Sequence, residues 1–107
     1  MYKVEYSPLA LEDLKGTGDY IIENWGKQAA DKILKKITSD IRTLEQYPFS
    51  GVSLGKIIDE PTEYRYLVSE KNYIFYLLES DRVRIIRVLN EKQDYIQHLF
   101  STNSENK

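Results

Sequence analysis

The sequence predicts a small α+β protein with the element order β-α-α-β-β-β-α, in which an antiparallel-dominated four-stranded sheet packs against an α-helical hairpin and a short C-terminal helix. Residues 64–90 contain three runs rich in β-branched and aromatic residues, separated by two short polar turns, which is typical of an antiparallel meander. Residues 8–25 and 27–46 repeat apolar side chains at the helical period. Residues 2–6 alternate apolar and polar side chains, as a strand does.

The 107 residues are enough for one domain with one hydrophobic core. We expect this domain to span residues 1–100. Residues 101–107 are polar and are expected to form a disordered tail.

Tight turns in the meander would place Arg65 opposite Tyr76 and Ile74 opposite Arg87. One face would then consist of Arg65, Leu67, Ile74, Tyr76, Leu78, Val83, Ile85 and Arg87. The other would consist of Tyr64, Tyr66, Val68, Tyr73, Phe75, Leu77, Ile86 and Val88, with Arg84 near its edge. Both faces are largely apolar, so the sheet is expected to be covered on both sides.

The first helix is predicted to begin at Ser7-Pro8, because serine is a favourable N-cap and proline suits the first helical position. Its predicted apolar stripe is Leu11, Leu14, Gly18, Ile21, Ile22 and Trp25. Gly26 suits the left-handed position that ends the helix. A turn this short joins the first helix to the second as an antiparallel hairpin.

The second helix is predicted to extend to about Gln46, where the segment 47–51 ends it. Its apolar stripe is Ala30, Ile33, Leu34, Ile37, Ile41 and Leu44. Residues 52–62 are expected to form a loop. Residues 91–100 are expected to form a last short helix that turns Tyr95 and Leu99 inward.

The composition excludes several functional classes. Without cysteine the chain has neither disulfides nor thiol catalysis, and with a single histidine a zinc site is improbable. No metal or cofactor is therefore expected. The sequence shows no signal peptide and no apolar run of about 20 residues, so we expect a cytoplasmic protein with no membrane partner. A net charge of −2 gives no support for direct sequence-specific nucleic-acid binding.

Three passages resemble the RelE/ParE superfamily of small bacterial toxins. They are Tyr6-Ser7-Pro8-Leu9-Ala10 with Asp13-Leu14; Asp19-Tyr20-Ile21-Ile22-Glu23-Asn24-Trp25-Gly26 with Ala30 and Leu44, Tyr47-Pro48 and Gly51; and Tyr73-Ile74-Phe75-Tyr76 with Arg87-Val88-Leu89, Asp94-Tyr95 and His98-Leu99. Each motif alone is weak, but their order and spacing resemble the superfamily from residue 2 to residue 100.

The resemblance implies the toxin of a bacterial type II toxin–antitoxin module of the plasmid-stabilisation kind. Such a toxin is stable and is blocked by the C-terminal segment of a labile antitoxin. RelE-like members cut mRNA on the ribosome, whereas ParE-like members poison DNA gyrase and are not nucleases.

The nuclease residues of RelE-like members are mostly missing. Ile74 stands where their third-strand motif has arginine, and Leu67 replaces the second residue of a basic pair. The run after the last strand is Asn90-Glu91-Lys92-Gln93 instead of a basic one. The chain therefore looks more like the ParE-like branch, and the resemblance implies gyrase as its target.

Two alternatives stay open. A ribosome-dependent mRNA endonuclease would have to use Arg65, Arg87, Tyr95 and His98 as its catalytic residues. A toxin fold without toxicity would act only as a partner-binding module.

For antitoxin or partner binding, the residues that we single out are Arg65, Ile74, Tyr76, Arg87 and Trp25. Each has a purely structural alternative. The arginines could instead pair with Glu91 or Asp94 and cap the core. His98 could be a surface residue beside Asp94, and Trp25 could staple the helical turn.

Overall fold

The computed structural model describes residues 1–58 and 61–100. Its elements in chain order are β1 (Lys3–Tyr6), α1 (Pro8–Trp25), α2 (Lys27–Arg42), the 3-10 turn η1 (Thr43–Glu45), β2 (Val52–Ser53), α3 (Gly55–Ile58), β3 (Arg65–Ser69), β4 (Asn72–Glu79), β5 (Arg82–Asn90) and α4 (Tyr95–Phe100). The predicted tail, residues 101–107, lies outside the described residues.

The predicted fold class is confirmed, with one strand more than expected. The sheet has five strands in the order β1-β5-β4-β3-β2. β1 lies parallel to β5, and the other neighbours are antiparallel. The segment 52–62 is not all loop, because Val52 pairs with Tyr66 and Ser53 with Arg65, and the short helix α3 follows. A strand of two residues is too short for its alternation to be recognised in the sequence.

The predicted register is correct for the β3–β4 pair, but it is shifted by one residue in part of the β4–β5 pair. Arg65 pairs with Tyr76 as expected. Ile74, however, pairs with Val88 and not with Arg87, because a bulge in the β4–β5 pairing leaves Ile86 without a partner. One extra residue in β5 moves every later side chain to the opposite face. The predicted faces of Arg87 and Val88 were therefore exchanged.

Each face of the sheet carries its own apolar cluster, as the sequence predicts. The cluster under the helical hairpin is Ala10, Ile37, Ile41, Leu44, Ile74, Tyr76, Val83, Ile85 and Val88. The cluster on the opposite face is Leu54, Phe75 and Leu89, with Ile58, Tyr64, Tyr66, Tyr73, Tyr95, Leu99 and Phe100 packed against it. β4 contributes to both clusters, because its successive residues point to opposite faces.

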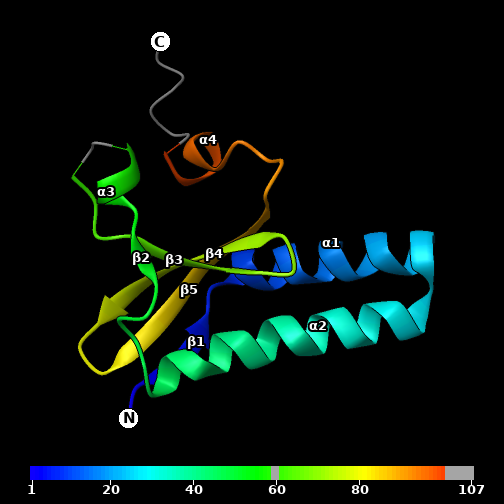
Figure 1. The fold of residues 1–107 in the computed structure, drawn as a ribbon, viewed down its shortest axis with the longest axis horizontal. Coiled ribbons are helices and arrows are strands. Elements are labelled where there is room, and N and C mark those ends of the chain that lie inside the picture. Colours follow the sequence, from blue (N-terminus) through cyan, green and yellow to red (C-terminus); the bar gives the residue numbers. More distant parts are fainter. Residues whose placement is uncertain (59–60, 101–107) are drawn as a thin grey trace.

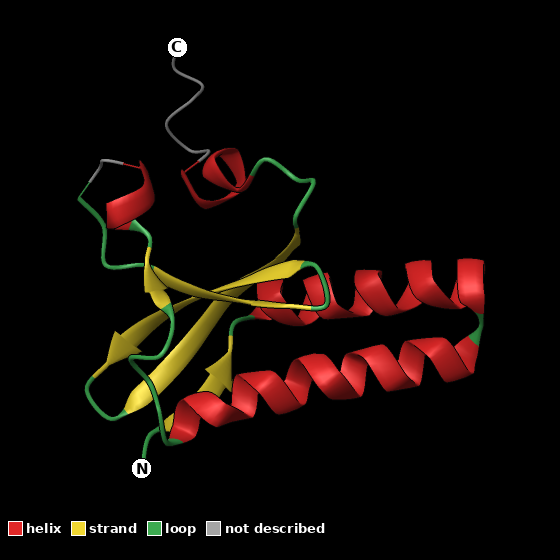
Figure 2. Ribbon diagram, in the orientation of Figure 1, coloured by secondary structure: helices red, strands yellow, loops and turns green. Residues whose placement is uncertain are grey.

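The hairpin of α1 and α2 extends well beyond the strands (Figures 1 and 2). Ser7 caps α1 as predicted: its Oγ accepts a hydrogen bond from the Ala10 N–H at 3.0 Å. Gly26 joins the two helices with φ 94°, the left-handed conformation that favours glycine. Within the described residues, no helix has both the length and the apolar character needed to cross a membrane.

The predicted apolar stripe of α1 coincides only in part with the face of the helix that is buried. Gly18 and Ile21 are buried, and Ala10, which the stripe omitted, is buried with them. Leu11, Ile22 and Trp25, which the predicted stripe includes, are 54%, 48% and 66% exposed. The packing face of α1 is rotated toward Ala10, which leaves an apolar strip in solvent.

Candidate functional site

Arg87 is held inside the molecule by Asp13 of α1. Its Nε donates to Asp13 Oδ2 at 2.8 Å and its Nη2 donates to Asp13 Oδ1 at 2.9 Å, and the two side chains are only 15% and 13% exposed. The hydrogen bond with Asp13 raises the pKa of Arg87 above its usual value, against the opposing effect of burial. The structural alternative therefore applies to Arg87, although its acid is Asp13 and not Glu91 or Asp94.

Arg65 fastens the loop that precedes β2. Its Nη2 donates to the carbonyl oxygens of Phe49 and Gly51 at 3.1 and 2.8 Å, and its guanidinium lies 5.4 Å from the centre of the Phe49 ring. The prediction that Arg65 and Arg87 share a face is wrong, because Arg65 pairs with Tyr76 and Arg87 with Phe75.

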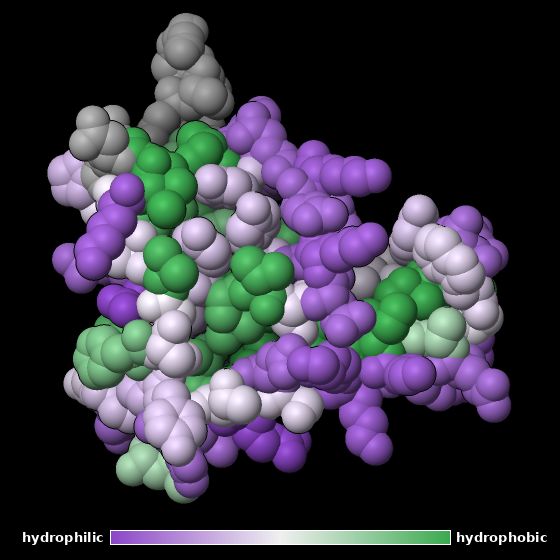
Figure 3. Space-filling view, viewed as in Figure 1, coloured by the Kyte–Doolittle hydropathy of each residue, from purple (hydrophilic) through white to green (hydrophobic). Residues whose placement is uncertain are grey.

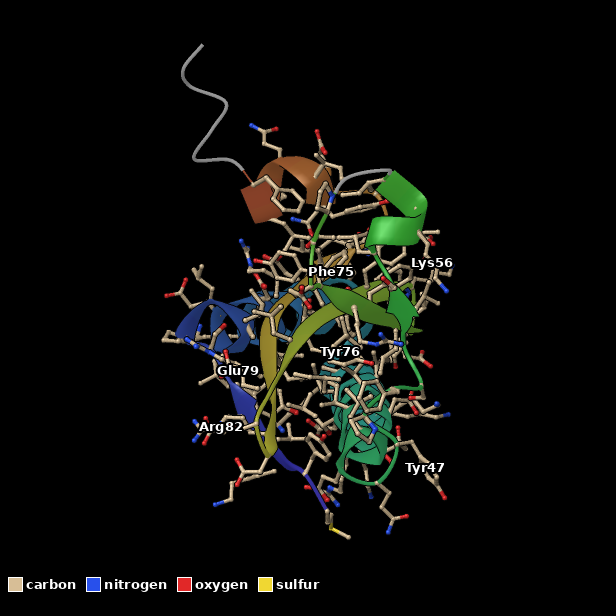
Figure 4. The ribbon with its side chains drawn as sticks, turned by 90° about the vertical axis from the view of Figure 1, so that its left-hand side faces the viewer. Tyr47, Lys56, Phe75, Tyr76, Glu79 and Arg82 are labelled. Atoms are coloured by element: carbon tan, nitrogen blue, oxygen red, sulfur yellow. The ribbon has the colours of Figure 1, made fainter. Side chains whose placement is uncertain are left out.

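Ile74 and Tyr76 have no exposed surface, so their assignment to a partner-binding site does not fit the structure. Figure 4 shows Tyr76 in the interior, with Tyr47 at the rim. The Tyr76 hydroxyl donates to the Pro48 carbonyl at 2.9 Å and accepts from the Gly51 N–H at 3.0 Å. Tyr76 is thus a core residue that also holds a loop.

Tyr95 and His98 lie on α4. The ring of Tyr95 packs against Tyr73 and Phe75 at centroid distances of 5.2 and 5.3 Å, and burial is the main cause that raises its pKa. This contact places Tyr95 on the Phe75 side of the sheet, opposite the side of Tyr76 and Arg65. His98 is exposed, in agreement with its surface alternative, and the structure shows no side-chain bond between it and Asp94 within residues 1–58 and 61–100.

Of the five residues singled out for partner binding, Trp25 is the one that lies mostly in solvent. It is 66% exposed, and its ring meets that of Tyr20, itself 60% exposed, edge to face at 5.9 Å. Trp25 therefore does not staple the turn into the core. The two rings form an aromatic pair near the tip of the hairpin.

This aromatic pair borders a hollow of about 610 Å³. The hollow separates the outer side of α1 from the β3–β4 turn and the loop after β5. Its lining is Glu12, Asp13, Gly16, Thr17, Tyr20, Trp25, Lys71, Val88, Asn90, Glu91, Lys92 and Gln93. In Figure 3, hydrophilic side chains crowd the space between the body of the molecule and the paler tip of the hairpin.

The hollow lined by these residues is called the groove below, and sequence reasoning missed most of it. Lys71, Lys92 and Tyr20 come from three separate segments, and only the fold brings them together. One signal was available in Gly16, a residue that is unfavourable inside a helix and lies off the apolar stripe.

The turn that carries Lys71 is strained and well supported. Glu70 and Lys71 have φ values of 50° and 65°, which non-glycine residues rarely adopt. The Asn72 side chain donates to the Glu70 carbonyl at 3.0 Å, and the Glu91 N–H donates to the Lys71 carbonyl at 2.9 Å. Positive φ suits a two-residue hairpin loop, and Ser80 in the β4–β5 turn has φ 45° as well.

The groove has the character of a binding surface. It offers two aromatic rings, the acids Glu12 and Asp13 on α1, and Lys71, Glu91 and Lys92 on the facing wall. No group of three or more His, Cys, Asp or Glu side chains that could hold a metal ion occurs among residues 1–58 and 61–100.

A family model described as the ParE toxin of the type II toxin–antitoxin system, parDE, matches residues 4–95. The chain therefore belongs to the ParE toxin family, and the predicted ParE-like branch of the superfamily is confirmed.

Solved structures agree on the fold. A structure described as the chromosomal ParDE toxin–antitoxin system from P. aeruginosa is similar with TM-score 0.72 and 20% identity, over 84% of this chain and 96% of that one. The YoeB/ParE toxin from Agrobacterium tumefaciens gives TM-score 0.53 and 15% identity, over 82% and 96%. The YoeB-YefM complex from Staphylococcus aureus gives 0.51 and 18%, over 83% and 95%. No curated protein sequence matches the chain significantly.

Proposed function

We propose that this toxin stops bacterial growth by binding and poisoning DNA gyrase, and that it does not cut RNA. The observation that supports this proposal best is where the structure places the four residues that a nuclease would need, and what each of them binds. Arg87 is bound to Asp13, and Arg65 is bound to the loop at 49–51. Tyr95 packs against Phe75, on the side of the sheet opposite Arg65, and His98 is exposed.

Cleavage of RNA at its 2′-hydroxyl would need an acid, a base and cations around one phosphate. In the described part of the chain, these four side chains do not come together around one point where a phosphate could bind. The buried Ile74, at the position where RelE-like members are expected to carry arginine, supports the same proposal. Membership of the ParE family favours gyrase over the ribosome as the target.

We further propose that a cognate antitoxin neutralises the toxin in the bacterial cytoplasm, and that the module stabilises plasmids that carry it. The exposed strip of α1 and the neighbouring groove give a partner chain apolar and charged surface to contact. Similar solved structures are those of a ParDE system and a YoeB-YefM complex, which supports a protein partner for this chain.

Induced expression of the chain in bacterial cells, with and without the protein encoded beside it, tests the proposal. We expect growth arrest that the second protein relieves, and loss of supercoiling by purified gyrase together with trapped cleaved DNA. Relaxation of DNA by topoisomerase I should not change and serves as the control.

Primer extension on cellular mRNA distinguishes the rival nuclease activity from gyrase poisoning. Codon-spaced cuts after induction, with gyrase unaffected, would establish the ribosome-dependent nuclease instead. Unimpaired growth on expression of the chain alone would leave only the non-toxic partner-binding module.

A further inference from the structure

The two helices of the hairpin carry charges of opposite sign. α2 contains five lysine and arginine residues against two aspartates, whereas α1 contains one lysine against four acidic residues. The net charge of −2 for the whole chain hides this difference. A positive surface on an otherwise acidic protein indicates a place where an anionic partner can bind.

The positive charge of α2 lies on its solvent side. Five polar residues follow one another there at intervals of three or four positions, and all are exposed: Gln28, Lys32, Lys35, Ser39 and Arg42. The buried residues Ala30, Ile37 and Ile41 lie on the other side of the helix. The five polar residues, called the basic stripe below, span about 21 Å at a rise of about 1.5 Å per residue. α2 forms the lower arm of the hairpin in Figure 2, on the outside of the molecule.

The aspartates of α2 do not neutralise the basic stripe. They are held by the other two lysines of the helix, at 3.3 and 2.7 Å, in the pairs Lys27–Asp31 and Lys36–Asp40. Lys32, Lys35 and Arg42 form no ion pair with any residue in 1–58 or 61–100. These three cations are therefore available to anionic groups of another molecule.

The chemistry of the basic stripe fits phosphate groups better than a protein or a lipid surface. The large apolar side chains that the hairpin exposes are all on α1, and α2 exposes none. A protein interface is usually anchored by aromatic or apolar side chains, and a helix that lies on a membrane inserts them. Lysine, arginine, serine and glutamine are instead the side chains that contact the phosphates of DNA.

We propose that the basic stripe binds the phosphate backbone of duplex DNA without reading its base sequence. The choice of DNA among anionic partners rests on the proposed function, because a toxin bound to gyrase is held beside the DNA on which that enzyme acts. Three phosphate contacts give weak binding in isolation. They become effective when gyrase keeps the toxin and the DNA together, since the local concentration of DNA is then high.

Fluorescence anisotropy of a labelled DNA duplex, titrated with the purified full-length toxin, measures this binding. At low salt we expect a Kd of about 10–100 µM, and a slope of about −2.7 for log K against log salt concentration. Lys32→Ala/Lys35→Ala should weaken binding at least tenfold at the same salt concentration and reduce the slope to about −0.9. Alanine favours a helix, so far-UV circular dichroism should show the fold unchanged.

Two matched variants separate the basic stripe from net charge. Lys3→Ala/Lys56→Ala removes the same charge from β1 and α3 and should change the Kd less than twofold. Lys32→Arg/Lys35→Arg keeps the charge of the stripe and should bind as the wild type does, because phosphate accepts either cation. Equal weakening by the two alanine double variants would show that only net charge matters and would overturn the proposal.

A duplex RNA of the same length tests the choice of nucleic acid. We expect RNA to bind no more tightly than DNA, because the basic stripe contacts phosphates alone. Binding of RNA more than tenfold tighter than DNA, lost in Lys32→Ala/Lys35→Ala, would make RNA the occupant and overturn the assignment to DNA.

Supercoiling by purified gyrase separates failure of this proposal from failure of the proposed function. Lys32→Ala/Lys35→Ala should require about tenfold more toxin for half-inhibition, and Lys3→Ala/Lys56→Ala should act as the wild type does. If both double variants inhibit gyrase as the wild type does, the assignment of the basic stripe is wrong and the proposed function stands. If the wild type binds DNA with the expected slope but leaves gyrase unaffected, the proposed function is wrong and the DNA-binding stripe stands.

Discussion

Tyr76 illustrates how one side chain can serve two structural purposes in this protein. Its ring is fully buried under the helical hairpin, and its hydroxyl pairs with the Pro48 carbonyl and the Gly51 N–H. Gly51 has to be glycine because an added Cβ would lie only 2.7 Å from the Tyr66 carbonyl and would clash with the tyrosine hydroxyl. Arg65 secures the same loop from the side.

Tyr76→Phe should therefore destabilise the protein by about 1–3 kcal/mol. The substitution keeps the ring but leaves the buried Gly51 N–H without a partner. Urea unfolding of both proteins, followed by far-UV circular dichroism, measures the difference. Tyr20→Phe removes an exposed hydroxyl and provides the control, and a loss no larger than in this control would contradict the role given to the Tyr76 hydroxyl.

At the scale of elements, one carboxylate ties α2 to the end of β3. Asp40 accepts from Lys36 Nζ at 2.7 Å on its own helix and from Ser69 Oγ at 2.6 Å. Partial burial alone would raise the pKa of Asp40, but the hydrogen bonds from Lys36 and Ser69 and the charge of Lys36 outweigh it and lower the pKa. The ionised form is therefore the one that holds the two elements together.

This lowered pKa predicts a pH dependence of stability. Asp40 contributes its full stabilisation above the ordinary carboxyl pKa of 3.8 and loses it as the pH falls through its lower folded value. The Tm of the wild type should exceed that of Asp40→Asn at pH 6, and the gap should narrow toward pH 3. Thermal unfolding at a series of pH values measures it.

Asp31→Asn is the matched control for Asp40. The Asp31 carboxylate lies 3.3 Å from Lys27 Nζ, also at a spacing of four residues on α2, but it is 67% exposed. The effect of this substitution on the Tm should be small at every pH. A gap that stays constant for Asp40→Asn between pH 6 and pH 3 would exclude the proposed titration.

At the scale of the whole molecule, two apolar clusters share one strand. Ile74 and Tyr76 of β4 belong to the cluster under the hairpin, while Phe75 between them belongs to the cluster under α3 and α4. Neither cluster can lose its order without disturbing the strand that both need. The domain should therefore unfold in a single transition.

Ile41→Ala in one cluster and Leu54→Ala in the other test this coupling. Both side chains are fully buried, so each variant should lose about 2–5 kcal/mol and still show one transition. Far-UV dichroism follows the long helices, and near-UV dichroism follows the tyrosines around Phe75. An early near-UV change in Leu54→Ala with the helices intact would show that the second cluster unfolds independently.

The sequence alone determined the fold class, the cap at Ser7, the turn at Gly26 and the pairing of Arg65 with Tyr76. These features depend on neighbours a few residues apart, so their periods and turn residues can be read along the chain. The ParE-like branch was also recognisable, because the motifs keep their order. The partner-binding and catalytic assignments depended instead on faces that the sequence could not fix.

Only the tertiary structure decided those faces. The bulge at Ile86 moved the side chains at the end of β5 to the opposite faces of the sheet. Asp13 became the ion-pair partner of Arg87, and the rotation of α1 exposed Trp25. The groove beside Gly16 joins residues 12–25 to residues 71 and 88–93, which no short-range pattern connects. Contacts between distant segments are settled by packing in three dimensions, whereas the periodicity of a sequence records only which side of its own element a residue occupies.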